Sequence, residues 1–158
     1  MLASCSTGRK AQRSETTVTE TIYVDTSHMS GRQKAVVEEA LEWLGTPYKY
    51  GGAEKGEGSD CSGLVTRVYV DMTGIKLPRQ SALQAEFCER LDPGDIRPGD
   101  LVFFATTRDD PSKVSHVGMV LDSEEFIHST SSRGVTVTRF DNAWWGPRLL
   151  FFGRVPGM

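Results

Sequence analysis

The sequence has few cysteines, no long apolar run and no excess of positive charge, and each absence excludes a class of protein. Three cysteines among 158 residues cannot form a disulfide framework, since at most one pair can close. No run of about 18 apolar residues occurs, so no segment is predicted to span a membrane. A formal net charge of −3 argues against a nucleic-acid-binding protein, which normally carries a basic face.

Residues 1–30 differ in composition from the rest of the chain. They are rich in Ser, Thr and charged residues and poor in large apolar ones. Such a segment buries too little surface to offset its ordering entropy, so we expect a flexible tether with at most a short strand at Thr21–Val24. Residues 31–158 are long enough to form one domain with its own core.

The start of the chain carries a candidate lipidation site. The run "LASC" at Leu2–Cys5 matches the small-residue pattern that precedes a lipidated bacterial cysteine. The basic and apolar regions of a signal peptide are absent, so either the sequence begins at a shortened start or the match is chance. A polar tether behind Cys5 suits a membrane-anchored domain, and such a lipid would be its only membrane contact.

Helical spacing of apolar residues marks the first half of the domain. The predicted helices run at about 32–44, from Cys61 to Gly74, and at about 80–90. Ser59 or Asp60 is well placed as N-cap of the second helix, which puts Cys61 in its first turn. The glycine-rich run "TPYKYGGAEKGEGS" before it is predicted to be a loop.

After residue 100 apolar residues recur at every second position, the period of a strand. The predicted strands are 101–105, 116–122, 125–129, 134–140 and 149–155. Helices followed by strands indicate an α+β domain, with the helices on one face of an antiparallel sheet.

Two of the three histidines fall in neighbouring predicted strands. A three-residue turn between these strands would pair Val120 with Phe126 and Gly118 with His128. His116 and His128 would then be diagonal neighbours on one face, within reach of each other across Gly118.

If the helix of Cys61 covers that face, a thiol hydrolase mechanism follows. Cys61 would be the nucleophile, since a helix N-terminus beside an imidazolium can lower a cysteine pKa to ~3.5–7.5. His116 would act as the base and His128 would orient it. The backbone N–H of Cys61 could form part of an oxyanion site.

Other interpretations of Cys61 remain open on this reasoning. A free cysteine in an apolar helix is more often a small core residue, which is also how we interpret Cys88 within the third helix. A zinc site from Cys61, Cys88, His116 and His128 is the rival chemistry, although no CxxC or HxxxH spacing supports it.

Several ordered motifs resemble the NlpC-type family of bacterial cell-wall cysteine peptidases. They are "SDCSGLV", "LPRQS", "RPGDLVFF", "SHVGMVL" and "FIHS", within about residues 33–155. The resemblance implies a papain-like fold in permuted order, Cys before His. Helices would come first and pack on a mainly antiparallel sheet of five to six strands.

The resemblance also implies roles for particular residues. Cys61 matches the family nucleophile, His116 the base, His128 the orienting residue and Tyr48 a tyrosine near the oxyanion site. The positions that match the family's substrate cleft are Asp60, Ser62 and Arg79.

The family hydrolyses amide bonds in peptidoglycan stem peptides or cross-links, commonly between D-γ-glutamyl and diaminopimelate residues. By this resemblance we expect a monomeric enzyme of the bacterial envelope, on its periplasmic or surface side, without a metal or organic cofactor. An amidase or acyl transferase of the same superfold, and a non-catalytic wall-binding lipoprotein, are the alternatives. Trp144 and Trp145 are either cleft-edge aromatics or packing residues at a sheet edge.

Overall fold

The computed structural model of the chain describes residues 22–158. Its helices are α1 (Gly31–Glu42), α2 (Cys61–Thr73) and α3 (Ser81–Phe87), with short 3-10 turns at Pro93–Asp95 and Gly146–Arg148. The strands are β1 (Ala53–Glu54), β2 (Gly58–Ser59), β3 (Glu89–Leu91), β4 (Leu101–Phe104), β5 (His116–Val120), β6 (Glu125–Thr130), β7 (Gly134–Arg139) and β8 (Leu149–Arg154). All three helices precede the strands β3 to β8, as predicted, but the short strands β1 and β2 lie between α1 and α2.

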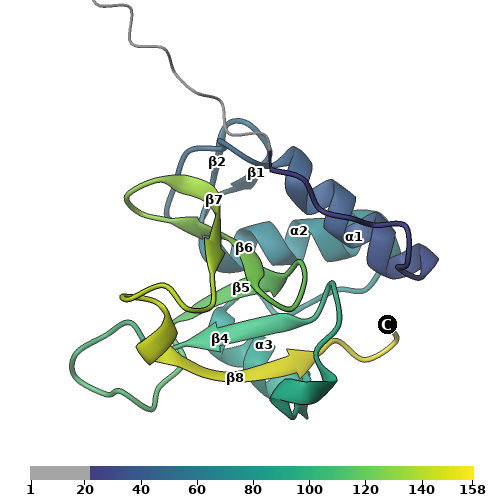
Figure 1. Cartoon of the computed structure of the whole chain (residues 1–158). Coiled ribbons are helices and arrows are strands. Elements are labelled where there is room, and N and C mark those ends of the chain that lie inside the picture. Colours follow the sequence, from purple (N-terminus) through teal and green to yellow (C-terminus); the bar gives the residue numbers. More distant parts are fainter. Residues whose placement is uncertain (1–21) are drawn as a thin grey trace, which may run out of the picture.

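Six strands form one antiparallel sheet in the order β3-β8-β4-β5-β6-β7, while β1 and β2 form a separate hairpin. Figure 1 shows α1 and α2 lying together on one side of the large sheet. This is the α+β arrangement that the sequence predicts.

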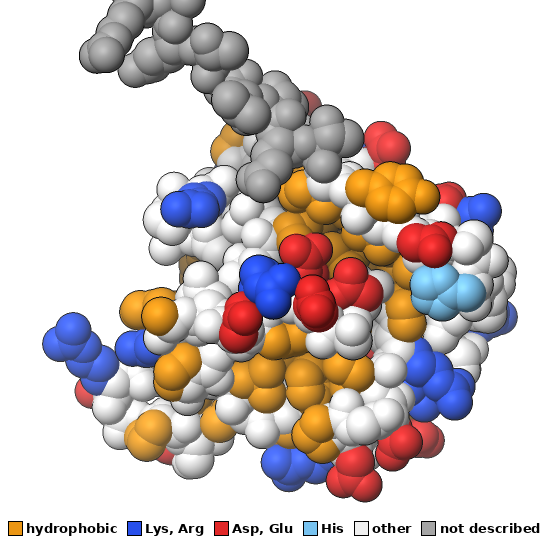
Figure 2. Space-filling view, viewed as in Figure 1, with side chains coloured by type: hydrophobic (Ala, Val, Ile, Leu, Met, Phe, Trp, Pro, Cys, Tyr) orange, Lys and Arg blue, Asp and Glu red, His pale blue; other side chains and the backbone are white. Residues whose placement is uncertain are grey.

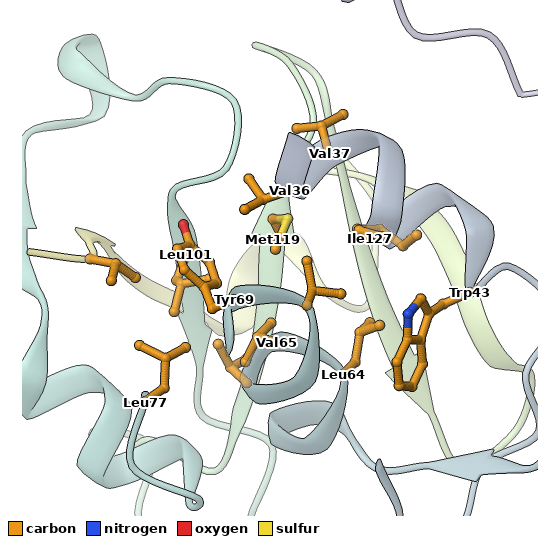
Figure 3. Close-up of a cluster of buried hydrophobic side chains, with 14 of the residues drawn as sticks. Val36, Val37, Trp43, Leu64, Val65, Tyr69, Leu77, Leu101, Met119 and Ile127 are labelled. Atoms are coloured by element: carbon orange, nitrogen blue, oxygen red, sulfur yellow. The ribbon is translucent and has the colours of Figure 1, made fainter. Parts of the chain in front are cut away.

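The main core lies between the two long helices and the sheet. Figure 3 shows Leu64, Val65 and Tyr69 of α2 between α1 and the strands, with Met119 and Ile127 behind them. All five side chains are fully buried. Burying an apolar side chain of this size stabilises a fold by roughly 1.5–3 kcal/mol, so this cluster fixes α2 on the sheet.

The other face of the sheet carries a second apolar cluster. Its buried members are Val102, Phe104, Val120, Phe126 and Phe152. Phe140 and Trp145, from the segment between β7 and β8, and Leu149, the first residue of β8, pack against it. The sheet is thus covered by helices on one face and by its own C-terminal segment on the other.

Local sequence fixes where α2 begins and ends. The Asp60 side chain accepts a 2.7 Å hydrogen bond from the backbone N–H of Gly63, as an N-cap does. Gly74 closes the helix with a φ of 74°, a left-handed conformation that favours glycine. Cys61 is therefore held at the first position of a capped helix, as predicted.

The third helix is shorter than predicted. It ends at Phe87, and Cys88 is extended, with φ −78° and ψ 150°. The chain then forms β3, in which Glu89 pairs with Arg154 of β8. The interpretation of Cys88 as a residue within a helix is wrong, because pairing at the sheet edge overrides the continuing apolar spacing.

Two further differences concern short segments. Ile22–Val24 form no strand, so the predicted strand is wrong where the structure describes it. Val24 and Met29 instead pack against the main core. Within the predicted glycine loop, β1 and β2 pair over only two residues each, too short a run to show a strand period.

The surface carries no broad field of one sign on the face seen in Figure 2, where acidic and basic side chains lie interspersed. Among residues 22–158, no helix combines the length and the apolar character needed to cross a bilayer.

Candidate active site

His116 and His128 meet as the hairpin register predicts. Met119 pairs with Ile127 and Val120 with Phe126, so the two histidines lie on one face as diagonal neighbours. The Nε2 atom of His116 lies 2.9 Å from Nδ1 of His128. Nε2 of His128 in turn lies 2.8 Å from the hydroxyl oxygen of Thr138. The three side chains form one hydrogen-bonded chain.

Gly118 makes the contact between the histidines possible. A Cβ added at Gly118 would lie 2.8 Å from a ring carbon of Phe126 and 3.3 Å from Cβ of His128. Contacts this short would force Phe126 or His128 to move. Because Gly118 has no side chain, the space between the two histidines stays open, as the predicted register requires.

The two imidazoles are held in a dry, aromatic environment. His128 is fully buried and His116 is 7% exposed. The Trp145 ring lies 4.6 Å from the centre of each imidazole, and Phe104 and Phe126 complete the cover. Burial lowers the pKa of His116 to about 3, and burial together with the charge of His116 lowers the pKa of His128 well below its ordinary value. Both rings are therefore neutral near pH 7.

The hydrogen bonds fix which nitrogen is free for chemistry. Nε2 of His116 is engaged with His128, so Nδ1 is the nitrogen left to face a substrate or a thiol. If Nδ1 carries the lone pair, Nε2–H donates to His128, and His128 donates through its own Nε2–H to Thr138. In this tautomer both Nε2 atoms donate a hydrogen bond, Nδ1 of His128 accepts one, and Nδ1 of His116 is free to accept a proton.

The condition set for the mechanism, that α2 covers the histidine face, is not met. Val117 and Ile127 point into the core under α2, while Val120 and Phe126, on the histidine face, belong to the second cluster. Register alone assigns residues to shared faces without deciding which face a helix covers.

Cys61 nevertheless reaches the histidines through the ends of the elements. Cys61 is the first residue of α2 and His116 the first residue of β5, and both line one cavity. The backbone N–H of Val117, next to His116, lies at the Cys61 sulfur. The cavity thus brings together a thiol and an imidazole from opposite sides of the sheet.

The predicted lowering of the Cys61 pKa is also wrong. Burial is the largest influence and raises the pKa of the thiol, and the nearby Asp60 carboxylate raises it further. The backbone N–H groups of Val117 and Ser62 lower it by less. Because the His116 imidazole is neutral, the expected imidazolium does not stabilise a thiolate at rest.

Two cavity lobes meet at Cys61. The first, about 620 Å³, includes His116, Arg133 and Trp144 in its lining. The second, about 650 Å³, lies toward Arg79. Both lobes are lined by Tyr48, Cys61 and Ser115. A substrate peptide that occupied both lobes would therefore pass the Cys61 thiol near its midpoint.

Tyr48 stands at the junction of the two lobes. Its side chain is 36% exposed, and a single bridge to Ser59 holds its backbone beside the start of α2. Partial burial, and then the neighbouring Cys61, raise the pKa of Tyr48. Tyr48 therefore presents a protonated hydroxyl near the thiol, in keeping with the predicted position.

Asp60, Ser62 and Arg79 form one interconnected group in the second lobe. Arg79 Nη2 lies 3.0 Å from both carboxylate oxygens of Asp60, and Nη1 donates to the Ser62 hydroxyl at 2.8 Å. Asp60 also accepts from Gly51 and Gly63. The predicted substrate-binding residues are thus brought together, and they also brace the start of α2.

Sequence reasoning missed Thr138 and the role of Trp145. Thr138 lies on β7, where His128 pairs with Thr136 and the alternation places both threonines on the histidine face. That alternation was available in the run "GVTVTRF". No local pattern could show that Trp145 covers both imidazoles while its neighbour Trp144 remains 46% exposed.

Cys88 lies apart from this group. A Cβ added at Gly153 would contact Cys88, which places the thiol at the β3–β8 edge. Among residues 22–158, no three His, Cys, Asp or Glu side chains are grouped to hold a metal ion, so the zinc alternative has no geometric support. Cys5 lies outside the described residues.

The chain has clear relatives. It is 37% identical over 114 residues to the "Gamma-DL-glutamyl hydrolase" of Bacillus subtilis (strain 168), covering 72% of this chain and 27% of the relative. It is 32% identical over 113 residues to the "Murein DD-endopeptidase MepS/Murein LD-carboxypeptidase" of Escherichia coli (strain K12), covering 72% of this chain and 57% of the relative. The chain therefore spans only part of these relatives.

A solved structure shares the fold. A protein of Staphylococcus aureus subsp. aureus Mu50, described as similar to a lipoprotein of the NLP/P60 family, superposes with a TM-score of 0.71 at 32% identity. The match covers 83% of this chain and 44% of that one. The fold is thus the papain-like one that the motifs predict.

Residues 45–154, well over half of the chain, match the NlpC/P60 family. This range contains α2, all the strands and the Cys61–His116–His128 group. The chain belongs to the NlpC/P60 family.

Proposed function

We propose that this chain is a cysteine endopeptidase that hydrolyses amide bonds in peptidoglycan stem peptides or their cross-links. Cys61 is the nucleophile, His116 the general base and acid, and His128 the residue that orients His116. The relatives named for γ-glutamyl and murein hydrolysis support the substrate class.

One observation carries the proposal. The 2.9 Å contact between His116 Nε2 and His128 Nδ1 leaves only Nδ1 of His116 free, in the cavity that Cys61 also lines. Nucleophilic acyl transfer requires a base that a second residue orients, and the cavity holds such a base together with a thiol.

Acylation then follows with a balanced proton count. The Cys61 sulfur attacks the scissile carbonyl carbon while its proton passes to Nδ1 of His116. The backbone N–H of Cys61 and the Tyr48 hydroxyl donate to the oxyanion. His116 returns the proton to the leaving nitrogen, the C–N bond breaks, and the acyl group remains on Cys61 as a thioester.

Deacylation reverses these roles with water. His116 takes a proton from a water molecule, and the resulting hydroxide attacks the thioester carbonyl. Collapse of the tetrahedral intermediate releases the carboxylic acid product and returns the proton to the Cys61 sulfur. His128 keeps the Nε2–H of His116 oriented throughout and stabilises the transient imidazolium.

Digestion of whole peptidoglycan in H₂¹⁸O tests the reaction class. Mass spectrometry of the products should show one ¹⁸O atom in each newly formed carboxyl group. An acyl transferase would instead give acylated products without that label, which would rule out the hydrolytic proposal.

The same digestion identifies the bond. We propose the D-γ-glutamyl–diaminopimelate bond or a related one, which the name of the Bacillus subtilis relative supports. The Escherichia coli relative is named as a murein DD-endopeptidase. Release of uncross-linked muropeptides with intact stems would assign the chain to cross-link cleavage instead.

A non-catalytic wall-binding role predicts that His116 does not activate the Cys61 thiol. Alkylation by iodoacetamide at neutral pH separates the two cases, because His116 assists only the thiol in the cleft. Cys61 should react at least several-fold faster than Cys88, whose pKa burial raises to about 12. Equal rates would favour the non-catalytic alternative.

We further propose an envelope location with Cys5 as a lipid-attachment site and residues 1–21 as the tether, since Val24 and Met29 of the predicted tether pack against the main core. The lipoprotein description of the Staphylococcus aureus relative supports this. Expression of the chain behind a lipoprotein signal sequence, with Cys5→Ala as the control, tests it: only the unaltered chain should partition into the detergent phase. We expect a monomer, which sedimentation analysis would check.

A further inference from the structure

We propose that the first lobe of the cleft is a carboxylate-binding subsite in which Arg133 selects substrates with a free carboxylate over their carboxamides. This inference rests on the proposed function, because it names the kind of residue that lies on one side of the scissile bond. It concerns the lobe lined by His116 and Arg133, away from the Asp60–Arg79 group.

The side chains that line this lobe are mostly hydrogen-bond donors, with one positive charge, which suits an anion. Eight of its fifteen residues are Ser or Thr, and Asn142 adds an amide. Among the described residues that line it, none is Asp or Glu, and Arg133 is the one permanently charged side chain. Hydroxyl donors around one guanidinium suit a carboxylate, which accepts several hydrogen bonds at once.

The guanidinium of Arg133 is not used elsewhere in the described part of the chain. The arginines that pair with carboxylates are Arg67, Arg79, Arg139 and Arg154. Arg148 stacks over Trp144 at 4.0 Å. Arg133 has no such partner among residues 22–158, so its five N–H donors remain available to a ligand.

The backbone around Arg133 is held in place. The N–H of Arg133 donates to the Thr130 hydroxyl at 3.1 Å, inside the β6–β7 turn. The next residue, Gly134, has a φ of 68°, and a Cβ there would lie 2.3 Å from the Thr46 carbonyl oxygen. Val135 donates to that same carbonyl at 2.9 Å. The turn is therefore packed against Thr46 and keeps Arg133 beside the lobe.

The acidic side chains near the first lobe form ion pairs with arginines other than Arg133. Asp141 precedes the lining residue Asn142, but Arg139 pairs with both Asp141 and Glu124. The second lobe differs, since its carboxylate, Asp60, is already paired with Arg79. A substrate carboxylate on the first-lobe side would therefore meet an unpaired cation.

The main test uses a matched pair of muropeptides that differ only in a free or an amidated diaminopimelate carboxyl. The wild type should cleave the free acid with up to about 5-fold higher kcat/KM, the range expected for an exposed arginine–carboxylate contact. Arg133→Gln should bring the ratio close to one, and Arg133→Lys should retain part of it. Arg108→Gln is the control, because Arg108 is exposed, carries the same charge and lines neither lobe.

A second test does not depend on murein cleavage. N-iodoacetylglycine and its amide alkylate a thiol by the same chemistry and differ only in a carboxylate. The rate ratio at Cys61 should favour the acid in the wild type and in Arg108→Gln, and fall in Arg133→Gln. Increasing ionic strength should reduce the preference.

The two experiments separate the subsite from the proposed function. If Arg133→Gln changes the alkylation ratio but no muropeptide is cleaved, the subsite stands and the peptidase proposal fails. If muropeptides are cleaved and neither ratio depends on Arg133, the peptidase proposal stands and the carboxylate subsite is wrong.

Discussion

At the scale of single residues, the site is a neutral pair rather than a preformed ion pair. Burial raises the pKa of Cys61 and lowers that of His116 to about 3, so both groups are uncharged near neutral pH. The proton therefore moves during attack, and the charges that develop on sulfur and imidazole stabilise each other within the cavity.

The pH dependence of kcat/KM tests this assignment. An imidazole with its ordinary pKa of 6.5 would be protonated at pH 5, which would reduce activity about 30-fold. Because the pKa of His116 lies near 3, we expect less than a threefold loss between pH 7 and pH 5 while the protein remains folded. An acidic limb centred near pH 6.5 would contradict the buried neutral base.

Trp145 should set that acidic limb, because its ring covers both imidazoles. Replacing it with Ala admits water, so the pKa of His116 should rise toward 6.5 and the limb should move to higher pH. Trp145→Phe should restore much of the wild-type profile. Trp144→Ala is the matched control, since the Trp144 ring contacts Arg148 and the Trp145 ring rather than the imidazoles, and it should leave the position of the limb unchanged.

At the scale of elements, the sequence predicts what depends on local signals. The N-cap at Asp60 and the glycine at Gly74 mark α2, and the alternation of apolar residues marks β4 to β8 to within two residues. The segments β1, β2 and β3 could not be predicted, because two or three residues carry no recognisable period. Their existence depends on partners distant in the sequence, such as Arg154 for β3.

Only the part of the candidate site that depends on local signals could be predicted from the sequence. Short-range pairing puts His116 and His128 together, whereas the face covered by α2 is decided by the packing of the whole domain. The pKa of Cys61 also depends on that packing, since its burial comes from elements far apart in the chain.

The β5–β6 hairpin offers a test at this scale. Gly118→Ala puts a methyl group 2.8 Å from the Phe126 ring and 3.3 Å from Cβ of His128, so the hairpin must shift. We expect a loss of about 1–3 kcal/mol in unfolding free energy, measured by urea denaturation, and a lower kcat. Gly94→Ala, with nothing within 4 Å of the added carbon, should leave both unchanged. A Gly118→Ala variant as stable and active as the wild type would show that the histidine contact does not need this space.

At the scale of the whole molecule, the buried histidines couple folding to pH. The unfolded chain binds a proton at His116 below pH 6.5, while the folded chain does not until pH falls to about 3. This contribution to stability is therefore complete above pH 6.5 and is lost as pH falls, by about 1.4 kcal/mol per pH unit.

Urea unfolding of the wild type and of His116→Asn measures this coupling. At pH 5 the wild type should have lost about 2 kcal/mol, relative to pH 7, that the variant does not lose. Carboxylates titrate in both proteins, so the difference isolates His116. Identical losses in the two proteins would mean that His116 is not held neutral by the fold.

The rate of muropeptide cleavage by Cys61→Ala decides whether Cys61 is the nucleophile of a murein peptidase. We predict a loss of at least about 10³-fold with the fold intact by circular dichroism, because removing a nucleophile leaves only binding and oxyanion stabilisation. Cys88→Ala, which alters a thiol at the β3–β8 edge, should stay within about twofold of the wild type. Cleavage by Cys61→Ala at the wild-type rate would show that Cys61 is not the nucleophile.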